Sequence, residues 1–269
     1  MIRATAYDET GAKVRWQDWG EGAPLLLLPG LSFPVALNLG EVAAHPALAH
    51  RRKILIDYPG SGWSDWREDG RYSLELHARA CLAVIEELGS GAVDIVGHSM
   101  GGTVAILAAF ERPGLVGRIV VAEANVEPGG GGASLAVARQ GREEFVSSGF
   151  PKMLERLLAD DDPGYGPPLR YAAWRDADPV AFFENAAGLV DLRGDFFERY
   201  AGLPMPRAFI YGGRNTGHVT PDTPDPARLE AAGIRAFTVA DAGHAMMFDN
   251  LAGFMEAVAE ALDMGAGQT

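Results

Sequence analysis

The sequence predicts an α/β fold with a mostly parallel sheet that is covered by helices on both faces. Short continuous apolar runs alternate with stretches whose apolar residues recur at helical spacing. Continuous apolar runs are typical of strands buried on both faces, and their alternation with helices is typical of right-handed βαβ units. Ligands bind such sheets at the carboxyl ends of the strands, so a functional site is expected there.

The first half of the chain contains the expected elements in a simple order. A buried strand is expected over 25–28 and another over 53–56, and a Pro-Gly pair follows each. A helix is expected over 73–88, with Ser73 as its N-cap and Gly89 as its stop. The next expected elements are a strand over 93–96, a helix over 101–110 and a strand over 119–122.

The alternation stops after Glu127 and resumes near Pro204. The segment between them, 127–203, opens with a glycine run and continues with helical, aromatic-rich sequence. We expect it to be a helical lid on a core made of 1–126 and 204–269. Its helices are expected at 134–147, 151–159 and 179–189, with a break over 160–168. After it come expected strands at 208–211 and 234–240, and expected helices at 227–232 and 253–262.

Composition excludes several classes of protein. Of the 269 residues, 48% are apolar, and 23 Lys and Arg against 36 Asp and Glu give a net charge of −13. This charge disfavours nucleic acids and anionic membranes as partners. The single cysteine, Cys81, excludes an internal disulfide. Neither a signal peptide nor an apolar run of membrane-spanning length is evident, so a cytoplasmic protein is expected.

A glycine-rich turn around Ser99 carries the clearest catalytic signal. Gly97-His98-Ser99-Met100-Gly101 follows an expected buried strand and opens an expected helix, which is the setting of a Gly-x-Ser-x-Gly nucleophile elbow. The tight turn leaves no room for side chains two residues before and two residues after the serine. The helix N-terminus places free N–H groups where an oxyanion would form. Ser99 is therefore the predicted nucleophile.

Together with this turn, three further motifs resemble those of the α/β-hydrolases. They are Leu28-Pro29-Gly30-Leu31, Asp57-Tyr58-Pro59-Gly60-Ser61-Gly62-Trp63-Ser64 and Ala242-Gly243-His244. The resemblance implies the α/β-hydrolase fold, a mostly parallel eight-stranded sheet flanked by helices with a helical cap inserted after strand 6. It also implies a Ser–acid–His triad that works without a cofactor.

A serine hydroxyl needs a neighbouring imidazole to accept its proton. His244 follows the last expected strand and matches the family's histidine, so it is the predicted base. His98 adjoins Ser99, but successive side chains diverge in such a turn, and we interpret it as a packing residue. No histidine is paired with a carboxylate or thiolate at metal-ligand spacing, so no metal site is predicted.

The triad acid departs from the family pattern. In most members an aspartate follows strand 7, and here Asn215 occupies that place. An asparagine can orient an imidazole but cannot neutralise an imidazolium. Glu123 ends the expected strand beside that of the serine, where a minority of the family places its acid, so Glu123 is the predicted acid. The alternatives are Asn215 as a neutral orienter, or Asp222, Glu127 or Asp241 as the acid. If Glu123 is the acid, Glu123→Gln should lower turnover far more than Asn215→Ala.

Two backbone N–H groups are expected to bind the oxyanion. One belongs to Met100, directly after the nucleophile, and the resemblance selects Leu31 for the other. Pro29 replaces the histidine usual in the family and has no N–H, which leaves Leu31 or Ser32 in that loop.

The substrate pocket is expected to be apolar. Beside the triad, its predicted residues are Ser32, Phe33 and Met246. Most lid aromatics are expected to pack the lid on the core, and a few to line the pocket. These aromatics are Phe145, Phe150, Trp174, Phe182, Phe183, Phe196 and Phe197.

The predicted function is cofactor-independent hydrolysis of a carboxylic ester or lactone through an acyl-serine intermediate. A thioesterase or a C–C bond hydrolase would use the same triad, because specificity lies in the lid. A ligand-binding receptor without significant turnover is the alternative from another class. The acidic excess favours a neutral or apolar small molecule as substrate. No sequence pattern predicts the oligomeric state.

Overall fold

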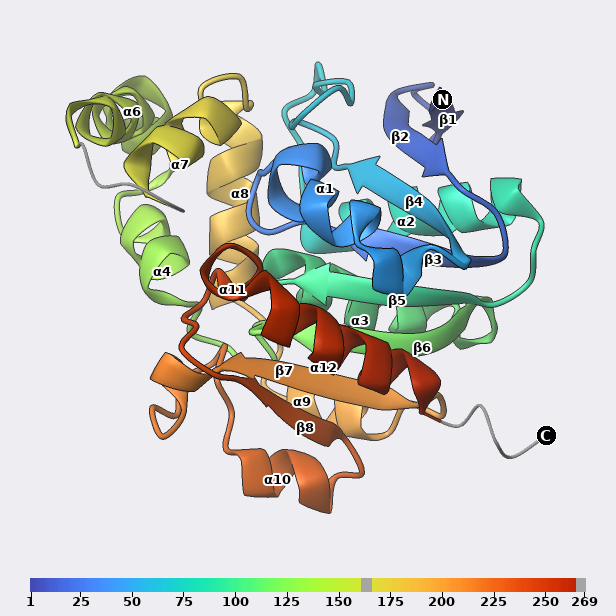
Figure 1. Ribbon diagram of the computed structural model, residues 1–269. Helices are drawn as coiled ribbons and strands as arrows, with labels where there is room; N and C mark the ends of the chain where they lie inside the picture. Colours follow the sequence, from blue (N-terminus) through green and yellow to red (C-terminus); the bar gives the residue numbers. More distant parts are fainter. Residues whose placement is uncertain (161–165, 265–269) are drawn as a thin grey trace.

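One sheet of eight strands runs through the described residues, 1–160 and 166–264, of the computed structural model (Figure 1). The strands are β1 (Ile2–Ala6), β2 (Lys13–Trp19), β3 (Ala23–Leu28), β4 (Arg51–Asp57), β5 (Val93–His98), β6 (Val116–Ala122), β7 (Arg207–Gly212) and β8 (Arg235–Val239). Their order is β1-β2-β4-β3-β5-β6-β7-β8. The β1–β2 and β2–β4 pairs are antiparallel and all the others are parallel, so the predicted, mostly parallel eight-stranded sheet is confirmed.

Helices cover both faces of this sheet. They are α1 (Val35–Ala44), α2 (Leu74–Leu88), α3 (Met100–Glu111), α4 (Gly132–Ala138), α5 (Arg142–Glu144), α6 (Phe150–Ala159), α7 (Pro167–Trp174), α8 (Pro179–Val190), α9 (Phe196–Ala201), α10 (Pro226–Ala231), α11 (Met246–Asp249) and α12 (Leu251–Asp263). Short 3-10 helices span Pro46–Leu48, Pro113–Leu115 and Gly213–Asn215, and a π-helical turn spans Phe145–Gly149. In the described residues, no helix combines the length and apolar composition that a membrane span requires.

Apolar side chains of the strands pack in two hydrophobic cores, one on each face of the sheet. Leu25 and Leu27 of β3 pack with α1 and α12, whereas Leu26 and Leu28 pack with α2 and α3. All four leucines are fully buried, because alternate side chains of a strand point to opposite faces. The apolar run over 25–28 is therefore continuous because β3 is buried on both faces, as the sequence predicts.

Helix α2 shows how local sequence sets an element's bounds. Ser73 Oγ accepts a hydrogen bond from the Leu76 N–H at 3.1 Å, so it caps the free N-terminal donors. Gly89 ends the helix in the left-handed conformation, with φ of 61°. Both predicted ends are correct.

Helices α4 to α9 occupy the chain between β6 and β7. Figure 1 shows β5 pointing towards α4 and α8, so part of this insertion stands at the carboxyl ends of the parallel strands. The single helix expected over 134–147 is wrong: α4 ends at Ala138, and Gly141, with φ of 79°, precedes α5. Helices α7 and α9 were not expected. Part of the expected break over 160–168 lies outside the described residues.

The insertion has an aromatic cluster of its own. Phe145, Phe150, Trp174 and Phe182 pack together there with Phe33, which comes from the loop after β3. Rings of Phe33 and Trp174 meet edge to face with centroids 5.5 Å apart. The insertion is thus joined by apolar packing to the loop that follows β3.

Candidate active site

Ser99 stands on a sharp turn between β5 and α3. Its backbone has φ of 53° and ψ of −123°, and α3 begins at the next residue. A Cβ added to Gly97 would lie 2.4 Å from the Gly101 carbonyl oxygen, and one added to Gly101 would lie 2.3 Å from that of Leu28. Both glycines are required because backbone, which cannot move aside, fills the space of a side chain.

Glu123 is the first residue after β6 and is fully buried. Its Oε2 accepts a hydrogen bond from His244 Nδ1 at 2.9 Å, and its Oε1 accepts one from the Gly212 N–H at the end of β7 at 2.8 Å. The residue after β6, the last residue of β7 and a residue of the loop after β8 thereby meet at one carboxylate. A buried carboxylate needs such partners, because leaving it unpaired costs several kcal/mol.

Asn215 also binds this carboxylate. Its Nδ2 lies 2.9 Å from Glu123 Oε1 and 2.8 Å from Oε2. The residue at the usual acid position therefore donates to the glutamate. Of the other acids weighed from the sequence, Glu127 pairs with Arg228, and Asp222, which lines the same cavity as His244, accepts from Thr220. Within the described chain, Glu123 is the acid hydrogen-bonded to His244.

The environment of His244 raises its pKa. Burial would lower the pKa, but the hydrogen bond and charge of Glu123, together with the charge of Asp222, outweigh it and raise the pKa above the ordinary 6.5. Nδ1 is the donor to Glu123, which leaves Nε2 of the neutral ring free to accept a proton. This is the orientation that the predicted role of His244 as a general base requires.

His98 supports the loop that carries His244. Its Nε2 donates to the His244 carbonyl oxygen at 2.9 Å, and burial, with the nearby His244, lowers the pKa of His98 to about 3. The ring stays neutral near pH 7. This agrees with its interpretation as a packing residue, although His98 also lines part of the cavity beside Ser99.

The loop after β3 and the start of α3 offer two free N–H groups. Among the described residues, neither Leu31 N–H nor Met100 N–H donates a hydrogen bond to another residue. The loop is held by Asn38, whose Oδ1 accepts from the Gly30 N–H at 2.8 Å. From the insertion, Trp174 Nε1 donates to the Leu31 carbonyl oxygen at 3.0 Å. The predicted oxyanion donors are thus free and their loop is braced from two sides.

A cavity of about 450 Å³ contains Ser99 and His244. Its lining is Gly30, Leu31, Phe33, His98, Ser99, Glu123, Asn125, Gly131, Gly132, Ala133, Ser134, Arg170, Trp174, Leu189, Asn215, His218, Thr220, Asp222, Thr223 and His244. Of the predicted pocket residues, Phe33 is present, but among the described residues Ser32 and Met246 are not part of this lining. Both are fully buried, and Met246 packs in the core beneath α12.

Several polar residues of the cavity were not predicted, among them Asn125 and Arg170; the others are Ser134, His218, Thr220 and Thr223. Asn125 follows β6 by three residues, so the rule that ligands meet the carboxyl ends of strands points to it. Arg170 lies in α7, and no sequence signal identifies which residues of the insertion face the cavity. Of the predicted lid aromatics, Trp174 lines the cavity.

Backbone strain gathers around this site. In the described chain, the non-glycine residues with positive φ are Ser32, Ser99, Glu123 and Asp241, which follow β3, β5, β6 and β8. Such conformations cost of order 1–3 kcal/mol each and persist where the surrounding structure fixes them. At Ser99 and Glu123, the positive φ of the backbone sets the direction of the side chain.

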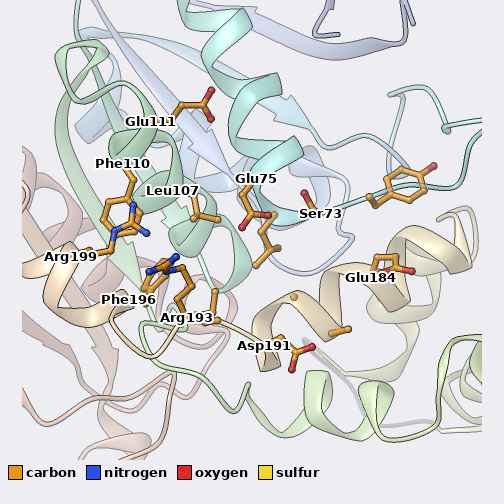
Figure 2. Close-up of a pocket in the computed structure, with 15 residues that line it drawn as sticks. Ser73, Glu75, Leu107, Phe110, Glu111, Glu184, Asp191, Arg193, Phe196 and Arg199 are labelled. Carbon is orange, nitrogen blue, oxygen red and sulfur yellow. The ribbon is translucent and has the colours of Figure 1, made fainter. Parts of the chain in front are cut away.

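A second cavity of about 430 Å³ lies away from Ser99, between α2, α3, α8 and α9 (Figure 2). Arg199 stacks there on the ring of Phe110, 4.1 Å from its centroid, and Glu75 and Asp191 line other parts of the same cavity. Among the residues described, no group of His, Cys, Asp and Glu side chains is placed to hold a metal ion in either cavity.

Known proteins resemble this chain in sequence and in structure. A model described as the alpha/beta hydrolase family matches residues 25–261. The chain is 29% identical over 249 residues to the esterase Rv0045c of Mycobacterium tuberculosis, covering 85% of this chain and 77% of that protein. A 114-residue part, 41% of this chain, is 34% identical to 40% of a 2-hydroxymuconate semialdehyde hydrolase of Pseudomonas putida.

Among solved structures, the esterase EaEST of Exiguobacterium antarcticum shares the fold. The TM-score is 0.78 and the sequence identity 20%, over 98% of this chain and 100% of that one. Because the family model spans most of the sequence, this chain belongs to the alpha/beta hydrolase family.

Proposed function

We propose that the protein is a cofactor-independent serine hydrolase that cleaves a carboxylic ester or lactone through an acyl-serine intermediate. The observation that carries the proposal is the 2.9 Å hydrogen bond between Glu123 and His244, beside the cavity that holds Ser99 on its strained turn. The similarity to an esterase over most of both chains supports the same class of reaction.

In the proposed acylation, Ser99 Oγ attacks the substrate carbonyl carbon and His244 Nε2 takes the hydroxyl proton. Glu123 accepts from Nδ1 and stabilises the imidazolium. The N–H groups of Leu31 and Met100 donate to the oxyanion. When the tetrahedral intermediate collapses, the C–O bond breaks and the alcohol leaves with the proton held by His244.

Deacylation repeats these steps with water. His244 takes a proton from water, the hydroxide adds to the acyl carbon, and the bond to Ser99 Oγ breaks as the oxygen regains its proton. The products are an acid and an alcohol, or one hydroxy acid from a lactone. We further propose that 127–203 acts as a lid over this chemistry.

A fluorophosphonate probe tests the nucleophile. We expect stoichiometric labelling of the wild type at Ser99 and none in Ser99→Ala, with labelling retained in Ser147→Ala, whose serine is exposed on the insertion. A folded wild type that resists the probe would favour a ligand-binding receptor without turnover. Burst release from a p-nitrophenyl ester then separates an acyl-enzyme from simple binding.

A second candidate is C–C bond hydrolysis on the same triad. It rests on the partial similarity to 2-hydroxymuconate semialdehyde hydrolase. Parallel assays with p-nitrophenyl esters of several acyl lengths, lactones, acyl thioesters and 2-hydroxymuconate semialdehyde compare the candidates. The highest kcat/KM identifies the bond that the enzyme cleaves.

A further inference from the structure

We propose that the active-site cavity contains a carboxylate subsite formed by Arg170 and Asn125, so that the substrate carries an anionic carboxylate beside its scissile bond. The inference rests on the proposed function, because it names the substrate class of the same site. It also replaces the neutral or apolar substrate expected from the net charge.

Arg170 presents an unpaired cation to the cavity. It lines the same space as Ser99 and His244, its Nε is buried without a hydrogen-bond partner, and within the described chain it forms no ion pair. Other arginines of the insertion, such as Arg142 and Arg175, are each paired with an acid. A guanidinium is always charged and offers only donors, so a buried donor of this kind calls for an anionic acceptor.

Asn125 supplies a second unpaired donor in the same cavity. Its side chain is 2% exposed, and its Nδ2 has no hydrogen-bond partner. Its position is fixed, since Thr103 Oγ1 donates to its backbone carbonyl at 2.9 Å. A buried amide donor without a partner costs about 1–3 kcal/mol. A carboxylate has two acceptor oxygens and can satisfy both Arg170 and Asn125.

A hydrogen bond ties the helix that carries Arg170 to the loop beside Ser99. Trp174 lies one helical turn after Arg170 in α7, on the same face of the helix. Its indole donates to the Leu31 carbonyl oxygen at 3.0 Å, in the loop that carries a proposed oxyanion donor. The helix bearing the cation is therefore tied to the oxyanion loop, and a carboxylate bound there is set at a fixed place relative to the scissile carbonyl.

The acids of the cavity do not already neutralise this cation. Glu123 is occupied by His244, Gly212 and Asn215. Asp222 accepts from Thr220 and forms no ion pair with Arg170 in the described chain. The net charge of −13 repels anions at long range, so recognition must come from these local donors.

Matched ester pairs test the subsite. One pair, 4-acetoxybenzoate and 4-acetoxybenzamide, carries the charge on the alcohol side; another, monophenyl adipate and phenyl hexanoate, carries it on the acyl side. We expect the wild type to prefer the anionic member of at least one pair. Arg170→Met should lower that preference, the ratio of the two kcat/KM values, by roughly 10- to 150-fold, and Asn125→Asp should lower it as well.

Two further variants make this ratio interpretable. Arg170→Lys keeps the positive charge but loses the planar guanidinium, which can donate two hydrogen bonds to one carboxylate, and it should give an intermediate preference. Arg175→Met removes the exposed arginine that directly follows the same helix and should leave the ratio unchanged. The proposal is overturned if the wild type shows no preference for the anionic ester, or if Arg170→Met and Arg175→Met have the same ratio.

A binding measurement separates this proposal from the hydrolase proposal. Calorimetry of Ser99→Ala with benzoate, and with benzamide as the neutral control, requires no turnover. Benzoate should bind at least tenfold more tightly than benzamide, and Arg170→Met in the same background should abolish the difference. Equal affinities would reject the subsite even if esters are cleaved, whereas selective binding without any cleavage would reject only the hydrolase.

Discussion

The side-chain amide of Asn215 donates to both carboxylate oxygens of Glu123, at 2.8 and 2.9 Å. The position that holds the acid in most of the family thus supports an acid that comes from the neighbouring strand. Substitution of Glu123 removes this carboxylate, whereas substitution of Asn215 removes only two of its hydrogen bonds. Mutation of each residue in turn can therefore separate the two contributions.

Glu123→Gln should lower kcat for a p-nitrophenyl ester by about 10³–10⁴-fold, since the amide no longer balances the imidazolium or fixes the right tautomer. Glu127→Gln is the matched control, because Glu127 pairs with Arg228 outside the proposed triad. A Glu123→Gln enzyme with a tenth of the wild-type kcat would rule out the assigned acid.

Asn215→Ala should lower kcat by roughly 10-fold or more, because a hydrogen bond to a charged group contributes about 1.5–3 kcal/mol. The sequence alone suggested that this change matters little, and the two contacts with Glu123 revise that expectation. Asn215→Asp should be more harmful, since it places a second negative charge against Glu123. An Asp variant more active than the Ala variant would contradict this account.

The pH dependence of kcat/KM should follow the protonation of His244. In the proposed mechanism the neutral ring is the base, so activity should rise with pH as the proton leaves, with an apparent pKa above 6.5 in the wild type. Removal of the Glu123 charge leaves burial as the dominant influence, so in Glu123→Gln the midpoint should move below its wild-type value. An unchanged midpoint would show that the observed titration belongs to another group.

Gly101→Ala should destabilise the fold, because the new Cβ would lie 2.3 Å from the Leu28 carbonyl oxygen. Overpacking costs about 1–3 kcal/mol, which lowers Tm by roughly 2–12 °C for a protein of this size. Gly114→Ala serves as the control, since a Cβ there meets no atom within 4 Å. Calorimetric melting of both variants checks the difference.

Acid should weaken the fold through His77. Burial lowers the pKa of His77 to about 4 in the folded state, despite its 2.7 Å contact with Asn185 of α8. Between pH 6.5 and 4 the unfolded chain binds the proton more readily, so stability present above pH 6.5 is lost as the pH falls. At pH 5 the loss is about 2 kcal/mol. Urea unfolding of wild type and His77→Gln at pH 7 and pH 5 should show a smaller loss in the variant, and equal losses would refute it.

The core was readable from the sequence because its signals are local. Ser73 and Gly89 bound α2 by capping chemistry, and the run 25–28 is apolar because both of its faces are buried. The elbow around Ser99 is partly local: Gly97 is required by the Gly101 carbonyl in the same turn, whereas Gly101 is required by the Leu28 carbonyl of the neighbouring strand β3.

The insertion was less readable, because its packing is decided by distant partners. Apolar spacing continues past Gly141, yet the helix ends before it. Phe196 and Phe197 pack in the main core instead of the insertion's own cluster. Met246 lies two residues after His244, but α11 turns it into the core. Closeness to His244 in sequence therefore determines neither the direction of a side chain nor whether that side chain lines the cavity.

The partners of Glu123 lie far along the chain, at separations of 89 residues for Gly212, 92 for Asn215 and 121 for His244. Contacts of such separation form late, because long loops must close before they are made. The turn at Ser99 is held by β3, β5, α3 and β6, since the Ser99 N–H donates to the Ala122 carbonyl oxygen of β6 at 2.8 Å. All four elements precede the insertion, so the turn can assemble before the insertion has folded. We therefore expect recovery of the proposed hydrolysis during refolding to follow the folding of β7 and β8. A chain that stalls before that point would hold Ser99 on its turn but would lack the contacts that place His244.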